Sequence, residues 1–369
     1  MPEWTEECVA RIETAELCCT YPRTVGKNSH LGSHGSGPVA PIVLVYTDGG
    51  AVGWGLLRVP PGQISDLAGR RLAELFDPEY GVIADDALPF DFALHDLAGV
   101  ILDLPVYRLL GNAECTAVPC YDGAIYMDDL DPEETPRGVE VVLENCAHDY
   151  ALGYRAFKLK IGRGYKWMER RSGLRRDVEV TRAVREHYPD CEILVDANDG
   201  YTGESFLQYL DGVVDCRLFW IEEPFPETRE DLLRLRRYLD RYSPQTLIAD
   251  GEAHPDLPFL LDLAREKLLD VLLMDIVGFG LTPWRRLMPE LQQIGVQASP
   301  HAWGVPLKTL YATHVAAGLG NVVTVEGVPG TATTIDATAY RLENGHLYLP
   351  DLPGWGIKPA LYEPSYGSR

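Results

Sequence analysis

The stretches RAFKLK (155–160), EILVDAN (192–198) and RLFWIEEP (217–224) decide the fold of this chain. Each is a short apolar run that ends in charged side chains, and a helical pattern separates it from the next. Continuous apolar runs are typical of parallel strands that are buried on both faces. Three more runs of this kind follow: TLIADGE (246–252), DVLLMD (270–275) and VQASPH (296–301). The alternation predicts a parallel sheet closed by helices.

In total, the chain contains eight such apolar runs. They begin near Val118, Arg155, Glu192, Arg217, Thr246, Asp270, Gly295 and Val322. Helical patterns lie between them, for example DLLRLRRYLDRY (231–242) and FLLDLAREKL (259–268). Eight strands alternating with helices predict a β/α barrel over residues 116–338.

The regions on either side of the predicted barrel have other patterns. Residues 1–115 mix strand-like and helical runs, which predicts a separate α+β domain. These runs are PIVLVYTD (41–48), AVGWGLLRV (51–59), SDLAGRRLAELF (65–76) and PFDFALHDLAGVILDLPVYRLLG (89–111). The glycine-rich residues 21–38 are expected to form a long loop. Residues 339–369 are expected to form a strand-and-turn tail that folds back on the first domain.

Composition and charge narrow the class of protein. The 369 residues include 46% apolar and 24% charged side chains, as in soluble globular proteins. A net charge of -22 argues against a nucleic acid partner, because such binding needs a basic surface. The sequence contains no run of about 18 apolar residues, so we expect no membrane span. The acidic start MPEWTEECVARIE does not resemble a secretory signal, which favours a cytoplasmic protein.

The cysteines do not form a metal-binding pattern. They are Cys8, Cys18, Cys19, Cys115, Cys120, Cys146, Cys191 and Cys216, and no Cys-x-x-Cys occurs. We expect reduced and mostly buried thiols.

Three carboxylates end three consecutive predicted strands: Asp196, Glu222 and Glu252. The carboxyl ends of barrel strands share one face, so these side chains would converge there. Oxygen ligands without Cys or His suit Mg²⁺ first and Mn²⁺ next. A single acid at such a place can also serve the dipole of the following helix, but three in matching places favour a metal site. Glu223 and Asp250 are close enough in sequence to be ligands instead.

Candidate bases end other strands of the same barrel. Lys158 and Lys160 lie two residues apart on one strand, so both point to the same side of the sheet. We expect their charges to lower each other's pKa and to favour a neutral amine; the alternative is an edge strand with solvated lysines. His301 follows the seventh strand, and Asp275 at the end of the sixth would hold its imidazole, as in other dyads.

This set of residues suits removal of a proton next to a carboxylate. The charge that develops lies on two carboxylate oxygens, and a divalent cation would stabilise the resulting enediolate. One base takes the proton, and a second group protonates carbon or expels a hydroxyl. Glu326 ends the eighth strand in VVTVEG (322–327) and is predicted to be a hydrogen-bonding acid beside the substrate carboxylate.

Together these motifs show that the chain resembles the enolase superfamily, in its mandelate racemase-like branch (the mandelate racemase/muconate lactonizing enzyme family). The motifs are FKLK (157–160), VDAN (195–198), WIEEP (220–224), GE (251–252), MDIVGFGLT (274–282) and SPHAWG (299–304). ALHDLAGVILDLPVYRLLG (93–111) is similar to the last helix of the family's capping domain. The resemblance implies an α/β fold, a modified (β/α)7β TIM-type barrel with an N-terminal α+β capping domain.

The resemblance also implies roles for the strand-end residues. It assigns Mg²⁺ to Asp196, Glu222 and Glu252. It places Lys160 and the His301–Asp275 dyad on opposite faces of the substrate. Lys158 and Glu326 would contact the substrate carboxylate. A homo-oligomer, a dimer or an octamer, is expected by the same analogy.

Further substrate contacts are predicted around this centre. Asn198 belongs to the VDAN motif, and Arg23, His30 and His34 belong to the loop 21–38, which closes over the barrel in relatives. The alternative is a mobile polar loop without a ligand role. Residues 161–177 are longer and more basic than a helix requires, and they form either a second loop over the site or an extended surface turn.

The commonest activity of this branch is dehydration of acid sugars (aldonates or aldarates) to 2-keto-3-deoxy acids, which would make the protein a Mg-dependent carbon-oxygen lyase. The same bases would serve a racemase or epimerase of a 2-hydroxy acid. A barrel that only binds sugar acids and a metal-dependent aldolase are the remaining alternatives. MDIVGFG (274–280) contains no lysine, which disfavours lactonisation and dipeptide epimerisation.

Overall fold

Eight parallel strands form the predicted barrel in the computed structural model, which describes residues 2–111, 116–252 and 255–357. The strands are β6 (Ala117–Ile125), β7 (Ala156–Lys160), β8 (Glu192–Asp196), β9 (Trp220–Glu222), β10 (Leu247–Asp250), β11 (Val271–Leu272), β12 (Gln297–Ala298) and β13 (Val325–Gly327). Strands from β6 to β12 pair with their sequence neighbours, and β13 pairs with β6. The ring closes where the Val323 N–H donates to the Ala298 carbonyl at 3.0 Å. The fold class and the eight strand positions are confirmed.

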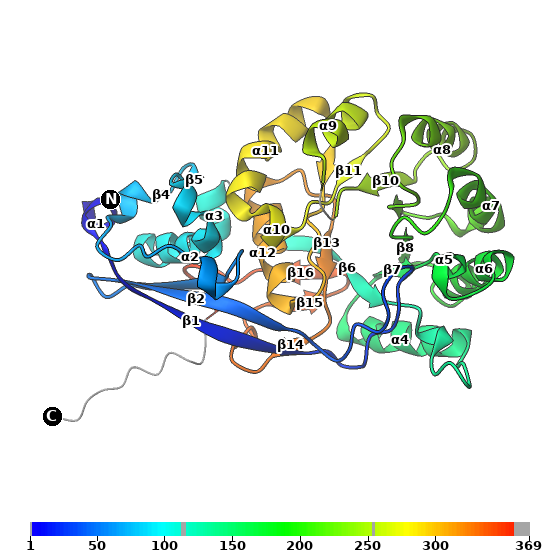
Figure 1. The fold of residues 1–369 in the computed structure, drawn as a ribbon, viewed down its shortest axis with the longest axis horizontal. Helices are drawn as coiled ribbons and strands as arrows, with labels where there is room; N and C mark the ends of the chain where they lie inside the picture. The colour runs from blue at the N-terminus through cyan, green and yellow to red at the C-terminus, as the bar shows by residue number, and fades with distance from the viewer. Residues whose placement is uncertain (1, 112–115, 253–254, 358–369) are drawn as a thin grey trace.

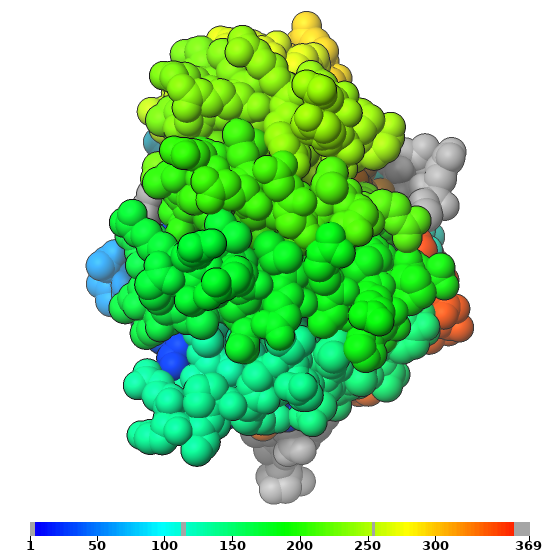
Figure 2. All heavy atoms as spheres, turned by 90° about the vertical axis from the view of Figure 1, so that its right-hand side faces the viewer, coloured from blue at the N-terminus to red at the C-terminus, as the bar shows by residue number. Residues whose placement is uncertain are grey.

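Seven long helices cover the outside of this barrel. They are α4 (Val139–Leu152), α6 (Arg170–His187), α7 (Gly203–Val213), α8 (Arg229–Tyr242), α9 (Leu257–Arg265), α11 (Leu281–Ile294) and α12 (Pro306–Leu319). Local capping defines several starts, as where the Thr228 side chain accepts from the Asp231 N–H at the start of α8. Figure 2 shows that consecutive segments from α4 to α9 cover one side of the molecule in sequence order.

Side chains alternate between the two faces of each barrel strand. Leu159 and Val195 belong to the core between sheet and helices, whereas Leu194 and Trp220 pack inside the barrel. Strand geometry places every second residue on the same face, so Lys158, Lys160 and Asp196 face inward with the second set. The apolar inner layer lies below them and leaves the carboxyl ends of the strands for polar groups.

The capping domain is built on a long antiparallel sheet (blue in Figure 1). Its elements are α1 (Pro2–Glu6), β1 (Val9–Thr20), β2 (Val39–Thr47), β3 (Val52–Leu56), β4 (Phe76–Asp77), β5 (Gly81–Val82), α2 (Asp91–Leu102) and α3 (Val106–Leu110). Glycine is required where α2 lies on β3, because a Cβ at Gly53 would lie 2.4 Å from the Ala93 carbonyl. The loop between β1 and β2 reaches from this domain to the mouth of the barrel (Figure 1).

One predicted helix is wrong. SDLAGRRLAELF (65–76) forms only a single 3₁₀ turn at Leu72–Glu74, because Gly69 adopts a φ of +80° that interrupts a right-handed helix. β1 was not among the predicted strands.

The chain after the barrel contacts both parts of the molecule. β14 (Thr331–Ala332) adds a strand to the capping sheet beside β1. The hairpin of β15 (Arg341–Glu343) and β16 (His346–Tyr348) pairs with the start of β6. Farther on, the Trp355 N–H and indole bond to α2 at Asp96 and Phe92. The tail therefore joins barrel and cap.

The three predicted units, 1–115, 116–338 and 339–369, stay a prediction. Residues 112–115 at the first boundary and 358–369 of the tail lie outside the described residues. Within the described ranges, no helix is long and apolar enough to cross a membrane. The described cysteines are free, mostly buried thiols, and Cys115 lies outside the described residues.

Candidate active site

The three predicted metal ligands lie together at the carboxyl ends of β8, β9 and β10. Asp196 pairs in register with Glu222 across the β8–β9 ladder, and Glu252 follows β10 by two residues. One carboxylate oxygen from each of the three lies within 4.8 Å of the other two. Asp196 and Glu222 are buried, and Glu252 is partly buried. The sequence prediction that these strand ends converge is confirmed.

The three carboxylates of Asp196, Glu222 and Glu252 are here called the carboxylate ring. Their chemistry fits a hard divalent cation. Burial, and then the charge of Asp196, raise the pKa of Glu222 well above its ordinary value, as expected of acids crowded together. Oε2 of Glu252 is buried and makes no hydrogen bond. An oxygen ligand set with a buried oxygen free to coordinate suits Mg²⁺.

Glu223 and Asp250 are not part of the ring among the described residues. The Glu223 carboxylate accepts the Glu252 N–H at 3.2 Å, so it supports the chain that carries a ring member. Asp250 is buried on β10 below Glu252.

Both predicted lysines point into the ring from β7. The Lys158 ammonium lies 2.9 Å from Glu222 Oε1, 2.9 Å from Glu326 Oε1 and 3.1 Å from Asp196 Oδ2. The Lys160 ammonium contacts Asp196 and donates to Asn198 Oδ1 at 2.9 Å. Asn198 is thereby placed at the rim of the ring.

The lysine pKa values move in the direction opposite to that expected from mutual repulsion. Burial lowers the pKa of Lys158. The charges of Glu222 and Glu326 raise it by more than this, so the pKa lies well above its ordinary value. The pKa of Lys160 is also raised: burial and the charge of Lys158 lower it, but the charges of Asp196, Glu252 and Glu222 together outweigh them. Spacing on one strand revealed the neighbouring lysine, whereas the short distances from each ammonium to the carboxylates across the barrel came only from the fold.

The predicted dyad lies on the other side of the ring. His301 Nδ1 is 3.0 Å from Asp275 Oδ2, and His301 Nε2 is 3.5 Å from Glu252 Oε1. Burial raises the pKa of Asp275, but the hydrogen bond from His301 and the charge of Lys308 lower it far below its usual range. Asp275 therefore stays ionised and accepts the Nδ1–H, which leaves Nε2 facing the ring.

Glu326 lies beside the carboxylate ring, between Lys158 and His301. Its Oε2 accepts the Ala302 N–H at 2.8 Å and lies 3.7 Å from His301 Nε2. A Cβ at Gly123 on β6 would lie 2.5 Å from Glu326 Oε1, so only glycine leaves room for this side chain. That glycine is a further residue of the site that strand patterns did not reveal.

The loop 21–38, here called the cap loop, lies over the barrel mouth. Ser29 Oγ donates to the Asn198 carbonyl at 3.1 Å, and Tyr21 OH donates to the Gly304 carbonyl at 2.6 Å. The His34 ring packs on Tyr126 with 4.6 Å between centroids. Burial, and to a smaller degree the charge of Lys160, lower the pKa of His34, so its imidazole tends to the neutral form.

Two other cap-loop candidates are engaged with protein groups. The Arg23 guanidinium pairs with Asp149 of α4 at 2.5 Å and donates to the Ala124 carbonyl. The His30 ring packs on Tyr165 with 4.3 Å between centroids. Substrate contact by Arg23 and His30 stays a prediction, and their observed contacts attach the cap loop to the barrel.

Residues 161–177 support the cap loop. They form α5 (Arg163–Lys166) and the start of α6. The Trp167 indole donates to the Asn28 carbonyl at 2.6 Å, and Lys166 Nζ donates to the His30 carbonyl at 2.9 Å. Beneath them the buried Arg163 pairs with Asp129 and Asp177 at 2.6 Å each. This segment is therefore more than a surface turn.

Backbone strain marks the same strand ends. Asn198, Asp199 and Glu223 have φ values of 41°, 58° and 39°, in the left-handed region that residues other than glycine seldom adopt. Such strain collects at functional sites. No sequence pattern signalled it.

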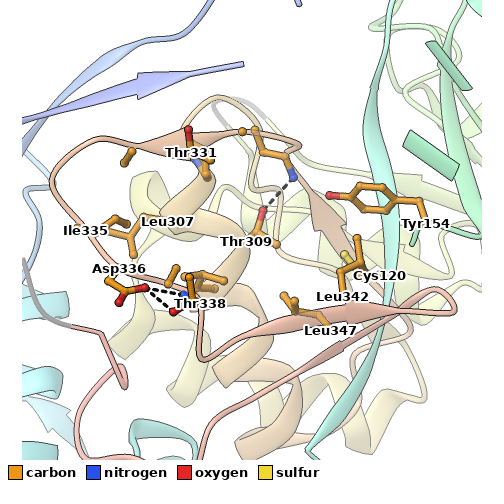
Figure 3. A pocket seen from close by; sticks show the side chains of 16 residues that line it. Cys120, Tyr154, Leu307, Thr309, Thr331, Ile335, Asp336, Thr338, Leu342 and Leu347 are labelled. Carbon is orange, nitrogen blue, oxygen red and sulfur yellow. Dashed lines mark hydrogen bonds between the residues drawn. The ribbon is translucent and has the colours of Figure 1, made fainter. Parts of the chain in front are cut away.

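Two cavities differ in their relation to these residues. A cavity of about 480 Å³ is lined by Glu252, Asp275, His301 and Lys308 and opens beside the carboxylate ring. Figure 3 shows another cavity, between α12, the chain after β13 and the β15–β16 hairpin. Its lining is mainly apolar and includes none of the predicted site residues. The first cavity is the candidate substrate site.

Two features of that site were missed in the sequence. Lys308 contacts Asp275, and Trp303 packs against Tyr126 with 4.9 Å between ring centroids. Trp303 lies in SPHAWG, whose aromatic residue was the one available signal. Nothing in the helical pattern around Lys308 indicated that it would reach the dyad.

Comparisons with known proteins agree with this geometry. The model of the family described as enolase C-terminal domain-like matches residues 142–362. D-xylonate dehydratase of Haloferax volcanii is 26% identical over 350 residues, covering 86% of this chain and 82% of that protein.

Two solved structures from Geobacillus are more similar. Galacturonate dehydratase, solved with D-galacturonate and 5-keto-4-deoxy-D-galacturonate, is 32% identical with a TM-score of 0.90, covering 96% of this chain and 95% of that one. A mandelate racemase/muconate lactonizing protein, solved with magnesium and tartrate, is also 32% identical, with a TM-score of 0.91 and coverage of 96% and 93%. The family model matches over half of this chain, and both structures match nearly all of it, so the chain belongs to the enolase superfamily, in its mandelate racemase/muconate lactonizing branch.

Proposed function

We propose that this protein is a Mg²⁺-dependent lyase that dehydrates an acid sugar. The observation that carries the proposal is the placement of two potential bases beside one carboxylate ring. Lys160 contacts Asp196 on one side, and His301 faces Glu252 and Glu326 on the other. A substrate held at the ring would have a proton-transferring group on each side.

Asp196, Glu222 and Glu252 are the groups that would hold the cation. When bound there, Mg²⁺ supplies positive charge next to the oxygens of the substrate carboxylate. Lys158 adds a fixed ammonium at the same place, because its contacts with Glu222 and Glu326 keep it protonated. Charge that develops on the substrate carboxylate is therefore met by groups that are already in position.

The two bases divide the proton transfers. One of them takes the proton from the carbon next to the carboxylate. The other gives a proton to the hydroxyl on the following carbon, so that water leaves and the enol product becomes a 2-keto-3-deoxy acid. The Nδ1–H of His301 is held by Asp275, so Nε2 is the atom that exchanges the proton. We expect His34, which packs on Tyr126, and Asn198, which accepts from Lys160, to contact sugar hydroxyls at the rim.

The substrate class includes uronates as well as aldonates and aldarates. D-xylonate dehydratase of Haloferax volcanii is named for an aldonate, and the Geobacillus galacturonate dehydratase contains a uronate and its 5-keto-4-deoxy product. Both substrates have a proton next to a carboxylate and a hydroxyl on the following carbon, so one site chemistry serves both. D-galacturonate is the first compound to test, because the similarity to the Geobacillus enzyme spans nearly the whole chain.

The test is proton NMR of the Mg²⁺-loaded protein in D₂O with D-galacturonate, D-xylonate, other aldonates and aldarates. A new methylene signal from one sugar, absent in His301→Asn, is the expected result. Deuteration of the carbon next to the carboxylate without a methylene would replace the proposal with a racemase or epimerase. Binding without either signal across the set would indicate a barrel that only binds acids.

Two further parts of the proposal concern the state of the protein. We propose that it works in the cytoplasm as a homo-oligomer, a dimer or an octamer. Light scattering of the purified protein measures the mass directly, and a monomer at working concentration would overturn this part.

A further inference from the structure

Lys308 is a cation in a place where elementary electrostatics disfavours one. It lies in the first turn of α12, where the helix dipole is positive, and its side chain is only 16% exposed. Its Nζ lies 2.6 Å from Asp275 Oδ2 and donates to the Trp303 carbonyl at 3.1 Å. A lysine that is buried against a helix N-terminus needs compensation, and the carboxylate of Asp275 provides it.

The contact with Lys308 completes the hydrogen bonding of Asp275. Oδ1 accepts the N–H groups of Val277 and Gly278 at 3.0 and 2.7 Å, at the start of α10 (Ile276–Phe279). Oδ2 is shared between His301 Nδ1 and Lys308 Nζ. Four donors thus surround one carboxylate and leave it little freedom to rotate.

This arrangement fixes the imidazole as well. A carboxylate only accepts, so Nδ1 of His301 must carry a hydrogen, and Nε2 is directed at Glu252 and Glu326. Without Lys308, Oδ2 would have one donor, and the carboxylate could turn toward the cavity of about 480 Å³ that Lys308 lines. The ring of His301 would then lose its fixed orientation.

We propose that Lys308 is a positioning residue of the reaction, which holds the Asp275 carboxylate in the plane that orients His301 toward the substrate. The inference rests on the proposed function in one respect, namely that His301 transfers a proton to or from the substrate. Removing a partner that orients such a group typically lowers activity by about 10- to 100-fold.

The first test is kinetic. Lys308→Met keeps the length and apolar stem of the side chain and is expected to lower kcat by about 10- to 100-fold with KM unchanged. Lys308→Ala is expected to regain activity with added n-propylammonium and not with n-propanol, because the missing element is a cationic donor. Lys267→Met is the matched control, since Lys267 Nζ donates to the Ile294 carbonyl on the surface, away from the site.

The second test needs no substrate. The Nδ1–H of His301 is observed by nitrogen-edited NMR of the Mg²⁺-loaded protein and assigned by its loss in His301→Asn. It is expected to be sharp in the unaltered protein and in Lys267→Met, and broadened or lost in Lys308→Met. If Lys308→Met does not fold, Lys308→Gln, which replaces the ammonium with a neutral amide, is measured in the same way.

The outcomes separate the two proposals. If no acid sugar turns over, the proposed function fails, and the NMR signal alone decides the role of Lys308. A sharp Nδ1–H signal in Lys308→Met, an unchanged kcat, or equal rescue by propanol and propylammonium would each overturn the positioning role.

Discussion

The barrel mouth and the junction of cap, tail and α12 both bury ionisable groups, and they do so in opposite ways. At the mouth, Lys158 and Asp196 stay charged because each has opposite charges around it. At the junction, burial raises the pKa of Asp96 to about 7 and lowers that of His314 to about 3, so both tend to their neutral forms. Lys158 and Asp196 therefore keep their charges where a substrate and a cation would meet them, although crowding raises the pKa of Glu222 beside them, whereas Asp96 and His314 tend to lose theirs where only packing is needed.

At the junction, Asp96 and His314 have hydrogen-bond partners among nearby protein groups. Asp96 accepts the N–H of Trp54 from the cap and the N–H of Trp355 from the tail, at 3.0 and 2.8 Å. His314 Nδ1 accepts the Tyr107 N–H at 3.0 Å, so Nε2 carries the hydrogen and donates to Tyr340 OH at 2.6 Å. The mouth, in contrast, keeps an unpaired buried oxygen on Glu252. The comparison therefore predicts that changes at the mouth alter activity and changes at the junction alter stability.

The largest effect is expected for Asp196→Asn. Losing one carboxylate of the ring should remove Mg²⁺-dependent thermal stabilisation and lower kcat by at least about 1,000-fold. The protein without metal should stay folded, because asparagine has nearly the same size and keeps an oxygen that can accept from Lys158 or Lys160. Thermal melting with and without Mg²⁺, together with the rate of 2-keto acid formation, measures both. Glu192→Gln, exposed at the start of β8, is the control that should change neither. Retained Mg²⁺-dependent stabilisation in Asp196→Asn would show that the ion binds elsewhere.

The reverse pattern is expected for Asp96→Ala. Two buried N–H groups lose their acceptor, and each unpaired group costs about 1–3 kcal/mol. We expect a loss of about 2–6 kcal/mol in the free energy of unfolding, measured by urea denaturation, with kcat per folded molecule unchanged. Asp351→Ala, which removes an exposed partner of Arg108, should change neither quantity. A fall in kcat without a fall in stability would contradict the claim that the junction affects stability and not activity.

The two buried groups at the junction, His314 and Asp96, should make the free energy of unfolding depend on pH. The pKa of His314 is about 3 in the fold and 6.5 in a model peptide, so only the unfolded chain gains a proton as the pH falls from 6.5 toward 3. This group should therefore remove up to about 1.4 kcal/mol of stability per pH unit in that window. Asp96 has the opposite slope, because the folded state keeps its proton between about pH 4 and 7 after the unfolded chain has lost it.

The measurement is the free energy of unfolding of the unaltered protein and of His314→Gln from pH 4.5 to 7. The difference between the two curves should shrink as the pH falls, because the variant lacks the acid-sensitive group. Parallel curves would mean that His314 does not titrate differently on folding.

The smallest effect is expected where the cap touches the mouth. The guanidinium of Arg58 donates to three carbonyls of the segment that follows Asp275, those of Val277, Gly278 and Phe279, at 3.0, 3.1 and 2.6 Å. Arg58→Ala frees this segment, and we expect kcat/KM to fall by about 10-fold with unchanged Mg²⁺-dependent stabilisation. Arg70→Ala, at an ion pair with Asp86 on the cap surface, is the control. Equal losses in both variants would point to a general loosening of the cap.

Much of the barrel could be predicted because its signal is local. An apolar run such as EILVDAN predicts a buried strand without any other information. Because all strand ends share one face of a barrel, Asp196, Glu222 and Glu252 are then expected to lie together. The wrong helix at 65–76 shows the limit, since one glycine with a positive φ outweighed an apolar pattern. β14 shows it again, because a two-residue strand becomes visible only when its partner β1 is in place.

The strand order, the acidic and basic residues at the strand ends and the reaction class could be predicted from local patterns, because they depend on periodicity and on the chemistry of single side chains. The folded chain was needed to show that Lys308 shares an oxygen of Asp275 with His301, and that Lys158 contacts three carboxylates. The pairing of Arg23 with Asp149 and the packing of His34 on Tyr126 were likewise evident only in the fold. Such contacts join residues far apart in the chain, and their energies depend on burial and on distances that no local pattern encodes.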